Sequence, residues 1–441
     1  RKSRRSRMGM VPFWRQGRKN PYTAPMPSFQ FLHCADLHID SPLRGLESDR
    51  DAPVEHIRGA TRAAFTALVD DAIARRVAFV VAAGDLYDGE WQDWRTGQFL
   101  IGQVARLSRV GIPFVAIRGN HDAESNLTRH LRLPEPARLL SARRPETVTL
   151  PELDVCIHGQ SFRTREVTEN IAAAYPPPMP GRLNIGLLHT SVDGREGHAT
   201  YAPCTVDQLR NHGYDYWALG HVHTREVLHR DPWIIFPGNP QGRHVRETGA
   251  KGATLVTVRD GRITDAEPMV YDTVRWAQVP VDLGGAVTEE DALAQARAAL
   301  ARATEDADGR LLAARVILAG ACAAHEILNR DAGATVEKVR AEALAVAGPE
   351  ALWTESVRLR TTPPTRDVAG SPLLAAIDAV DPAALAQPAV EYCRALIDRA
   401  SGLRDALGDD HPAIAALRDG TVPPDLLARA KALLLARLSE G

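Results

Sequence analysis

The sequence predicts an α/β protein whose main part is a largely parallel sheet covered by helices. Two observations support this class. From Phe29 onward, short apolar runs typical of buried strands alternate with segments whose apolar residues recur at helical spacing. The chain has 441 residues, of which 44% are hydrophobic and 24% are charged, so it is long enough for two or three folded domains.

The first elements follow one another as strand, helix, strand, helix and strand. Strands are expected over residues 30–35, 77–83 and 112–117, and a helix over residues 99–107. Between the first two strands, one helical face carries the apolar residues Phe65, Leu68, Val69, Ala72 and Ile73. A βαβαβ succession of this kind predicts parallel neighbours in one sheet.

Further strands are expected downstream, at residues 185–188, 214–219, 233–236, 253–258 and from Ile263. Asp260 and Gly261 supply a hairpin turn into the last of them. These strands complete a second sheet by residue 270. We therefore expect one α/β domain over residues 28–270.

The remaining segments differ in composition. Residues 1–27 are rich in Arg, Lys, Gly and Pro without periodicity, so we expect a disordered basic leader, either a DNA-touching arm or a dispensable segment upstream of Met26. Residues 271–365 predict a small α+β domain with strand, helix, helix and strand, its edge strands at 279–281 and 357–359, closed by Pro363 and Pro364. Residues 366–441 are rich in Ala and Leu and predict helices.

Charge and cysteine content narrow the function classes. The net charge is only −2, so no overall electrostatic attraction to nucleic acid is visible, although a neutral sum can conceal a basic groove. The five cysteines are scattered without a CxxC pair, which argues against a disulfide framework and a zinc-thiolate site. Arg4 and Arg5 resemble an export signal, but the apolar stretch after them is too short and broken, and no run reaches the roughly 18 apolar residues of a membrane span. We expect a cytoplasmic protein.

Polar clusters follow five of the expected strands: Asp36-Leu37-His38, Gly84-Asp85, Gly119-Asn120-His121-Asp122, His189, and Gly220-His221-Val222-His223. Sites in α/β sheets form beyond the carboxyl ends of the strands. Imidazoles mixed with carboxylates and an amide bind Mn, Fe or Zn, whereas Mg prefers oxygen ligands. Residues i and i+2 of an extended segment project to one side, so Asp36 with His38, and His221 with His223, can each offer two ligands. Each motif alone is equally typical of a turn or a structural histidine, but together they predict a two-metal site.

This order of motifs (DLH, GD, GNHD, a strand-ending His and GHVH) resembles the calcineurin-like metallophosphoesterase superfamily over residues 28–270. The resemblance implies a four-layer αββα sandwich and phosphoester hydrolysis with two divalent metal ions. It implies that one metal is held by Asp36, His38 and His223, and the other by Asn120, His189 and His221. Asp85 would bridge the two. His121 would stabilise the transition state or protonate the leaving oxygen, with Asp122 orienting its imidazole.

A finer resemblance comes from FLHCADLHID, GDLYD and the stretch GNPQGRHVRETG over residues 238–249. These are similar to the SbcD-like DNA repair exonucleases, particularly the YhaO-type branch. That similarity implies a metal-dependent DNA exonuclease or endonuclease, with Mn²⁺ as the expected metal and Mg²⁺, Fe²⁺ or Zn²⁺ as alternatives. The α+β domain over 271–365 resembles the family's capping domain. The helical tail would dock an SbcC-like coiled-coil ATPase, or simply cap the same chain, and a homodimer is a further candidate assembly.

Two features leave the substrate open. Asp88 stands where archaeal and eukaryotic relatives carry His, and bacterial SbcD-type sequences also carry Asp at this position. Any nuclease role carried over for that histidine is therefore in doubt. Loop residues suited to phosphate contact are Arg118, Arg243, His244 and Arg246, and ordinary solvated loop side chains explain them equally well. The alternative functions are a small-molecule phosphodiesterase or nucleotidase, and a non-enzymatic scaffold with a vestigial metal site.

Overall fold

A computed structural model describes residues 27–41, 53–88, 94–123, 132–192 and 201–364, with isolated positions between 387 and 421. The expected basic leader and helical tail fall almost wholly outside the described residues, so both stay predictions. The chain divides into two compact units. The first unit comprises Arg1–Ile39, Thr66–Asn239 and Gly252–Met269, and the second unit comprises Asp40–Phe65, Pro240–Lys251 and Val270–Gly441.

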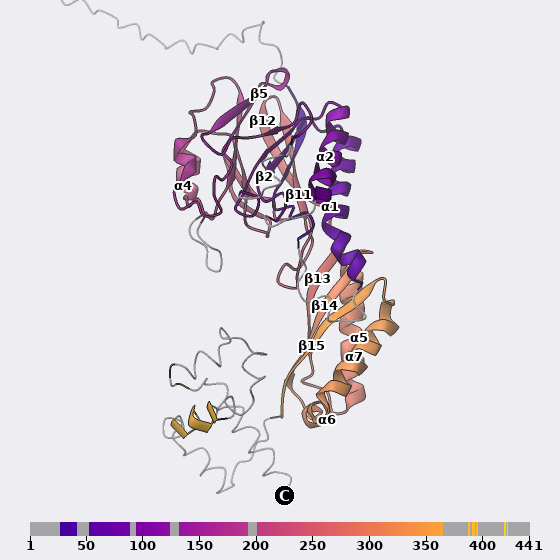
Figure 1. The fold of residues 1–441 in the computed structure, drawn as a ribbon. Coiled ribbons are helices and arrows are strands. Elements are labelled where there is room, and N and C mark those ends of the chain that lie inside the picture. The colour runs from indigo at the N-terminus through magenta and orange to yellow at the C-terminus, as the bar shows by residue number, and fades with distance from the viewer. Residues whose placement is uncertain are drawn as a thin grey trace, which may run out of the picture. The chain divides into compact units, whose positions relative to one another are not determined.

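The first unit contains two six-stranded sheets (Figure 1). The first sheet has the strand order β12 (Arg262–Val270), β11 (Gly252–Arg259), β1 (Phe29–Cys34), β2 (Val80–Ala83), β3 (Phe114–Ile117) and β4 (Arg138–Leu139). Strands β1 to β4 run parallel, as the βαβαβ pattern predicted, and β11 is antiparallel to β1. The carboxyl ends of β1, β2 and β3 therefore meet at one edge of this sheet.

The second sheet has the order β5 (Glu146–Leu150), β6 (Val155–Gly159), β7 (Leu183–His189), β8 (Tyr216–Gly220), β10 (Trp233–Phe236) and β9 (Glu226–Arg230). The four central strands are parallel, and the edge strands β5 and β9 are antiparallel to their neighbours. Short 3₁₀ helices lie at Pro151–Leu153 and Ile171–Ala174.

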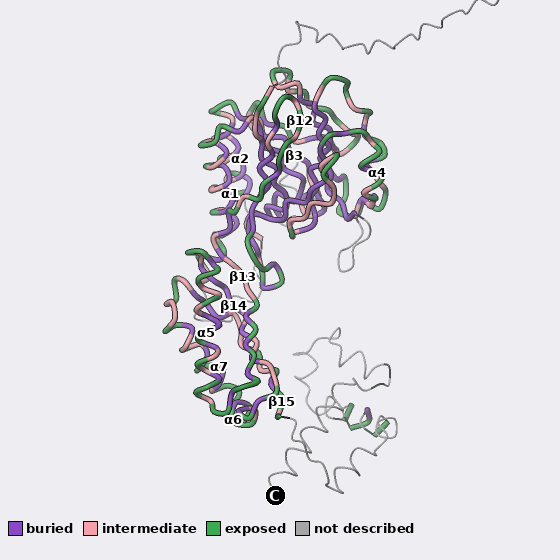
Figure 2. Tube along the Cα trace, turned by 180° about the vertical axis from the view of Figure 1, so that it is seen from behind, coloured by how far each residue is buried: buried purple, intermediate pink, exposed green. Residues whose placement is uncertain are grey.

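Apolar side chains from both sheets form one core between them, including Phe31, Phe79, Ile185, Leu187 and Ile235. Figure 2 shows buried residues concentrated along these strands. Helix α2 (Trp94–Arg109) and the second half of α1 (Val54–Arg75) lie side by side on one side of the sheets, and α4 (Val206–Asn211) lies on the other (Figure 1). The expected αββα sandwich is thereby confirmed. No helix in the described part of the chain combines the length and hydropathy that a membrane span needs.

The second unit is built on a three-stranded, all-parallel sheet of β13 (Val274–Asp282), β14 (Leu311–Ala321) and β15 (Leu352–Thr362). Helices α5 (Glu289–Asp306), α6 (His325–Arg330) and α7 (Ala332–Ala347) belong to this unit, as does the first half of α1. Helix α5 begins at a capping box of Thr288 and Asp291. Apolar residues of α5 and α7 pack on one face of this sheet. The central strand β14 was not among the expected elements.

The boundary between the units also differs from the expected split at residue 270. Segments 40–65 and 240–251 belong to the second unit. Ile57, Ala60 and Val245 share a small core with Trp276 and other residues of β13 to β15. Gln241 Nε2 donates to the Val274 carbonyl at 2.7 Å. Burial of these apolar side chains therefore makes the second unit discontinuous in sequence.

Candidate metal centre

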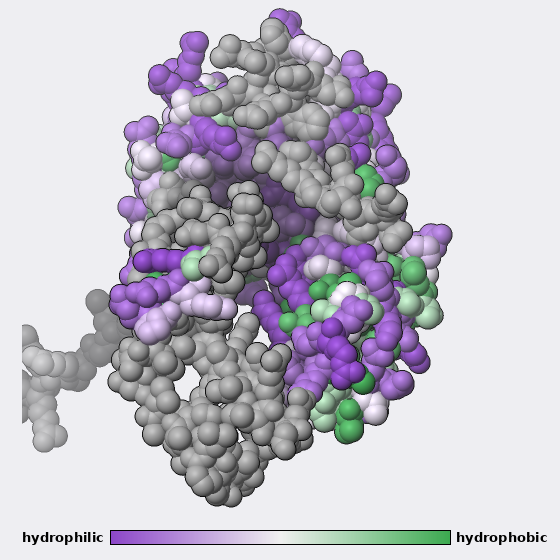
Figure 3. Space-filling view, turned by 60° about the horizontal axis from the view of Figure 1, so that its bottom comes forward, coloured by the Kyte–Doolittle hydropathy of each residue, from purple (hydrophilic) through white to green (hydrophobic). Residues whose placement is uncertain are grey.

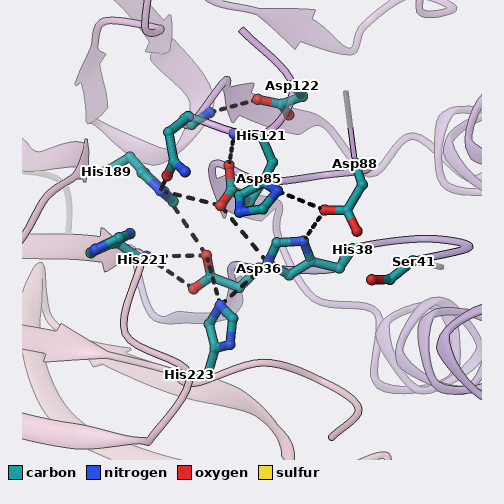
Figure 4. A network of polar contacts seen from close by, with 12 residues as sticks. Asp36, His38, Ser41, Asp85, Asp88, His121, Asp122, His189, His221 and His223 are labelled. Carbon is teal, nitrogen blue, oxygen red and sulfur yellow. Dashed lines mark hydrogen bonds and ion pairs between the residues drawn. The ribbon is translucent and has the colours of Figure 1, made fainter. Parts of the chain in front are cut away.

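The seven expected metal ligands converge at the strand ends of the first unit, where Figure 4 labels six of them and Asn120 contacts His189. Asp36 and His38 follow β1, Asp85 follows β2 and Asn120 follows β3, whereas His189 ends β7 and His221 and His223 follow β8. Each sheet thus supplies part of the set. All of them are buried except His223, whose side chain is 21% exposed.

The donor atoms form two neighbouring groups around Asp85. His38 Nε2 lies 3.2 Å from His223 Nε2, and His189 Nε2 lies 3.0 Å from Asn120 Oδ1. The Asp85 Oδ2 atom lies 3.8 Å from His38 Nε2 and 3.4 Å from His189 Nε2. Donor atoms within 4.8 Å of one another are offered by Asp36, His38 and His223, and by Asp36, Asp85 and His189. The first group is the set that the resemblance implied for one metal.

The second nitrogen of two histidines is already engaged on the far side of the ring. His38 Nδ1 lies 2.6 Å from Asp88 Oδ1, and His189 Nδ1 donates to the Ala83 carbonyl at 2.9 Å. A carbonyl oxygen can only accept, so the Nε2 lone pair of neutral His189 points at the oxygens of Asn120 and Asp85. Acceptors that face one another in this way need a cation between them. The residues therefore fit a pair of divalent ions with mixed nitrogen and oxygen ligands.

The pKa shifts of the same residues indicate that a positive charge is favoured at this site in the metal-free protein. Burial works against a charged imidazole, yet the Asp85 and Asp36 carboxylates raise the pKa of His189 to about 9. Burial also opposes a charged carboxylate, but His189 and His38 hold the pKa of Asp85 well below its usual range. Burial raises the pKa of Asp36, partly offset by His223 and His189. A proton on His189 thus takes the place that a metal ion would hold.

The comparisons with known proteins agree with this geometry. Residues 29–225 match the calcineurin-like phosphoesterase family. These residues are similar to calcineurin-like phosphoesterase domains, and the first unit is called the phosphoesterase domain below. Residues 276–362, in the second unit, match the middle domain of the metallophosphoesterase YhaO.

The chain is also similar to a metallophosphoesterase and to repair proteins of other organisms. The chain is 37% identical over 257 residues to the uncharacterized metallophosphoesterase YhaO of Bacillus subtilis (strain 168), covering 57% of this chain and 63% of that protein. It is 25% identical over 300 residues to the DNA double-strand break repair protein Mre11 of Methanopyrus kandleri, covering 59% and 61%. The Mre11 protein of Sulfurisphaera tokodaii is 26% identical over 241 residues, covering 52% and 60%. The chain spans less than two thirds of the length of these relatives.

The backbone of the phosphoesterase domain is tightly turned at the expected ligands. Asp36, His38, Asp85 and His221 all have positive φ, between 42° and 102°. The expected extended geometry of the Asp36/His38 and His221/His223 pairs is therefore wrong, although the side chains still converge. Left-handed backbone at non-glycine residues is costly and collects at functional sites. A Cβ on Gly220 would lie 1.9 Å from the Ala83 carbonyl oxygen, so only glycine fits between the two sheets there.

The phosphoesterase domain places His121 beside the ligand groups, with Asp88 rather than Asp122 at its ring. His121 Nδ1 lies 2.9 Å from Asp88 Oδ1, the same atom that contacts His38. Asp122 instead accepts backbone N–H groups from Gly119 at 2.7 Å and Leu86 at 2.9 Å. Burial and the nearby Asp85 charge raise the pKa of Asp122 to about 8. Asp122 thus holds the loop in shape, and the orienting role expected of it is better suited to Asp88.

Two aromatic residues of the phosphoesterase domain were not predicted as part of this centre. Phe162 lies edge-on to His189, with ring centroids 5.4 Å apart, and Tyr201 lies edge-on to His221 at 5.3 Å. Both pack against rings of expected ligands and limit how those rings can rotate. No local motif marks either residue in the sequence.

The four residues expected to contact phosphate lie in different units: one in the first unit and three in the second. Arg118 precedes Gly119 and Asn120 directly after β3, so it lies on a loop that carries an expected ligand. Arg243 and His244 both lie near the Glu247 carboxylate, at 3.3 Å and 3.6 Å, and Arg246 is exposed. These three belong to the second unit. Of the four, Arg118 lies in the unit that contains the expected metal ligands.

Proposed function

We propose that this chain is a metal-dependent nuclease that hydrolyses phosphodiester bonds of DNA. The observation that carries the proposal is the pair of donor groups on either side of the Asp85 carboxylate, with His121 next to them. In this assignment Asp36, His38 and His223 hold one ion, and Asn120, His189 and His221 hold the other. Similarity to Mre11 repair proteins supports DNA as the substrate.

The chemistry divides between the ions and the chain. Two divalent ions, when bound, lower the pKa of a bound water and neutralise charge on the phosphate oxygens. His121, one third exposed, is placed to donate a proton to the leaving oxygen. The Asp88 carboxylate would stabilise the charged form of that imidazole and keep its other nitrogen turned outward. We propose Mn²⁺ as the best activating ion, because the ligands combine imidazole and oxygen.

The surface suits a charged substrate that approaches through water. Hydrophilic side chains dominate the described part of the face shown in Figure 3, with small apolar areas among them. Arg118, on the loop after β3, is the first candidate for a phosphate contact in the same unit.

The function is tested with the purified full chain and Mn²⁺ or Mg²⁺. The substrates are end-labelled linear duplex DNA, single-stranded DNA, closed circular DNA and a chromogenic phosphodiester, each with and without a chelator. We expect chelator-sensitive cleavage of DNA, lost in an Asp85→Asn variant. Hydrolysis of the chromogenic diester without cleavage of any DNA form would replace the nuclease by a small-molecule phosphodiesterase. If none of these substrates is hydrolysed, the alternative of a non-enzymatic scaffold protein is favoured.

We further propose that residues 366–441 dock an SbcC-like ATPase. This rests on the sequence alone: the segment follows Pro363 and Pro364 and carries apolar positions at helical spacing, Leu426, Leu427, Ala430 and Leu434. Deletion of the segment should spare hydrolysis of a small phosphodiester and abolish co-purification with the ATPase. A truncated protein that still binds the ATPase would move the interface elsewhere. One that loses its metals and activity would show that the segment belongs to the folded core.

A further inference from the structure

A buried polar bridge joins the two sheets of the phosphoesterase domain. His33 lies on β1 in the first sheet, and Tyr216 and Leu219 lie on β8 in the second. His33 Nδ1 lies 2.9 Å from the Tyr216 hydroxyl, and His33 Nε2 lies 3.1 Å from the Leu219 carbonyl oxygen. Both side chains are fully buried.

The partners determine which atom donates. The Leu219 carbonyl can only accept, so His33 Nε2 carries the proton and donates to it. His33 Nδ1 then accepts from the Tyr216 hydroxyl. Burial lowers the pKa of His33 to about 3, so the ring is neutral in the pH range in which proteins work. Both ring nitrogens are satisfied, and the ring is held at two points on the opposite strand.

The bridge lies directly behind the metal centre. His33 is three residues before Asp36, and Leu219 is two residues before His221. Asp36 itself accepts the backbone N–H of His221, at 3.1 and 3.0 Å from its two oxygens. Strands β1 and β8 are thus tied twice within a few residues of the ligands that they carry.

The offset between these strands matters because each ligand group takes members from both sheets. Asp36 and His38 come from the first sheet and His223 from the second, while Asn120 comes from the first and His189 from the second. A shift of β8 along β1 would change donor separations in both groups at once. Metal affinity therefore depends on how firmly the offset is held.

We propose that His33, together with Tyr216, is a positioning residue that sets the offset of the two sheets for metal binding. The inference rests on the proposed two-metal function and concerns how this chain builds that site. The hydrogen bond between His33 and Tyr216 is not expected to contribute mainly to folding stability. Replacing both partners of a buried hydrogen bond by apolar groups of similar shape is close to neutral for folding. The neighbours of the bridge include the apolar rings of Phe31 and Phe79 and the polar residue Thr254, which pairs with His33 across β1 and β11.

The test compares the double variant His33→Leu/Tyr216→Phe with the wild type as full chains. Mn²⁺ binding is followed by calorimetry, the spin coupling between two bound Mn²⁺ ions by electron paramagnetic resonance, and thermal unfolding in chelator. We expect Mn²⁺ affinity to fall about 10–100-fold, as for other residues that orient ligands, with an altered coupling signal and an unfolding temperature close to that of the wild type. His33→Gln should recover part of the affinity, because its amide offers both a donor and an acceptor.

His158→Leu is the matched control. His158 is also buried and bonded through both nitrogens, at 2.9 Å to Thr147 and 3.1 Å to Asn184, but all three residues belong to the second sheet. Its loss should lower stability and leave Mn²⁺ affinity unchanged.

The outcomes separate this inference from the proposed function. A folded double variant that binds two Mn²⁺ ions with wild-type affinity and coupling would overturn the positioning role alone. Parallel losses of affinity in the double variant and in His158→Leu would also overturn it, because affinity would then follow stability. If the double variant does not fold, the Mn²⁺ affinity and unfolding temperature of Tyr216→Phe alone are compared with those of the wild type and of His158→Leu, and the same outcomes apply. A wild-type protein without a two-ion site would overturn the proposed function as well.

Discussion

Replacing Asp88 by Asn tests the assignment that the structure changed most. One oxygen of this carboxylate contacts both His38 Nδ1 at 2.6 Å and His121 Nδ1 at 2.9 Å. Asn keeps the shape and an acceptor oxygen but removes the charge. The substitution therefore weakens the hold on one expected ligand and on the expected proton donor, without opening a cavity.

The magnitude follows from the charge of the acceptor. A hydrogen bond to a charged group contributes about 1.5–3 kcal/mol, more than a neutral one. A proton donor acts in its charged form, so loss of the Asp88 charge lowers the population of charged His121 imidazole and with it kcat, by up to about 10- to 150-fold. Weaker orientation of His38 adds about a 10- to 100-fold loss of metal affinity.

The assay is the initial rate on a chromogenic phosphodiester with Mn²⁺ varied to saturation, so that kcat and metal affinity are obtained separately. Asp207→Asn is the control, because that carboxylate is exposed and pairs only locally with Arg210. A kcat of Asp88→Asn within about twofold of the wild type would exclude this role for the Asp88 carboxylate. A large fall in kcat with Asp122→Asn instead, with metals retained, would return the orienting role to Asp122.

Three further predictions concern single positions. His121→Asn should leave the Mn²⁺ content intact and lower turnover by about 10²–10⁴-fold, and near-normal turnover would assign His121 to structure. Gly220→Ala should destabilise the protein by about 1–3 kcal/mol in denaturant titrations, because the new Cβ would meet the Ala83 carbonyl. Gly59→Ala, in open space on α1, is the control and should stabilise the protein by about 0.5–1 kcal/mol. Similar effects of the two substitutions would contradict the close approach of the sheets at Gly220. The pKa of His189 is raised from 6.5 to about 9, so its contribution to the stability of the metal-free protein is complete below pH 6.5 and is lost as pH rises towards 9. Thermal unfolding in chelator should show this decline in stability. A His189→Gln variant whose stability declines equally would exclude His189 as the source.

The central strands were predictable because each is a short apolar run bounded by turns. Val80–Ala83 and Phe114–Ile117 are fully buried, and their runs show it in the sequence. Edge strands carry a weaker signal: β4 has two residues, and β9, Glu226–Arg230, is half polar. The strand β14 was missed because its alanines do not favour strands and its first four residues, Leu311–Ala314, are all buried, so the strand begins without alternation.

The expected ligands were predictable because each follows a strand within a short motif, and parallel strands bring such motifs to one edge. The contacts that support them were not. Asp88 meets His121 and His38 only through the fold, and His33 meets Tyr216 across 183 residues of sequence. The extended geometry assumed for the DLH and HVH motifs failed because positive φ at Asp36, His38 and His221 turns the backbone sharply.

The most direct test of the two-metal account is a crystal structure of the full chain grown with Mn²⁺, with anomalous diffraction recorded at the manganese edge. Two anomalous peaks are expected, one on each side of the Asp85 carboxylate, with His38 and His223 at one and His189 and Asn120 at the other. A single peak, or two peaks of which only one lies within coordination distance of Asp85, would contradict it.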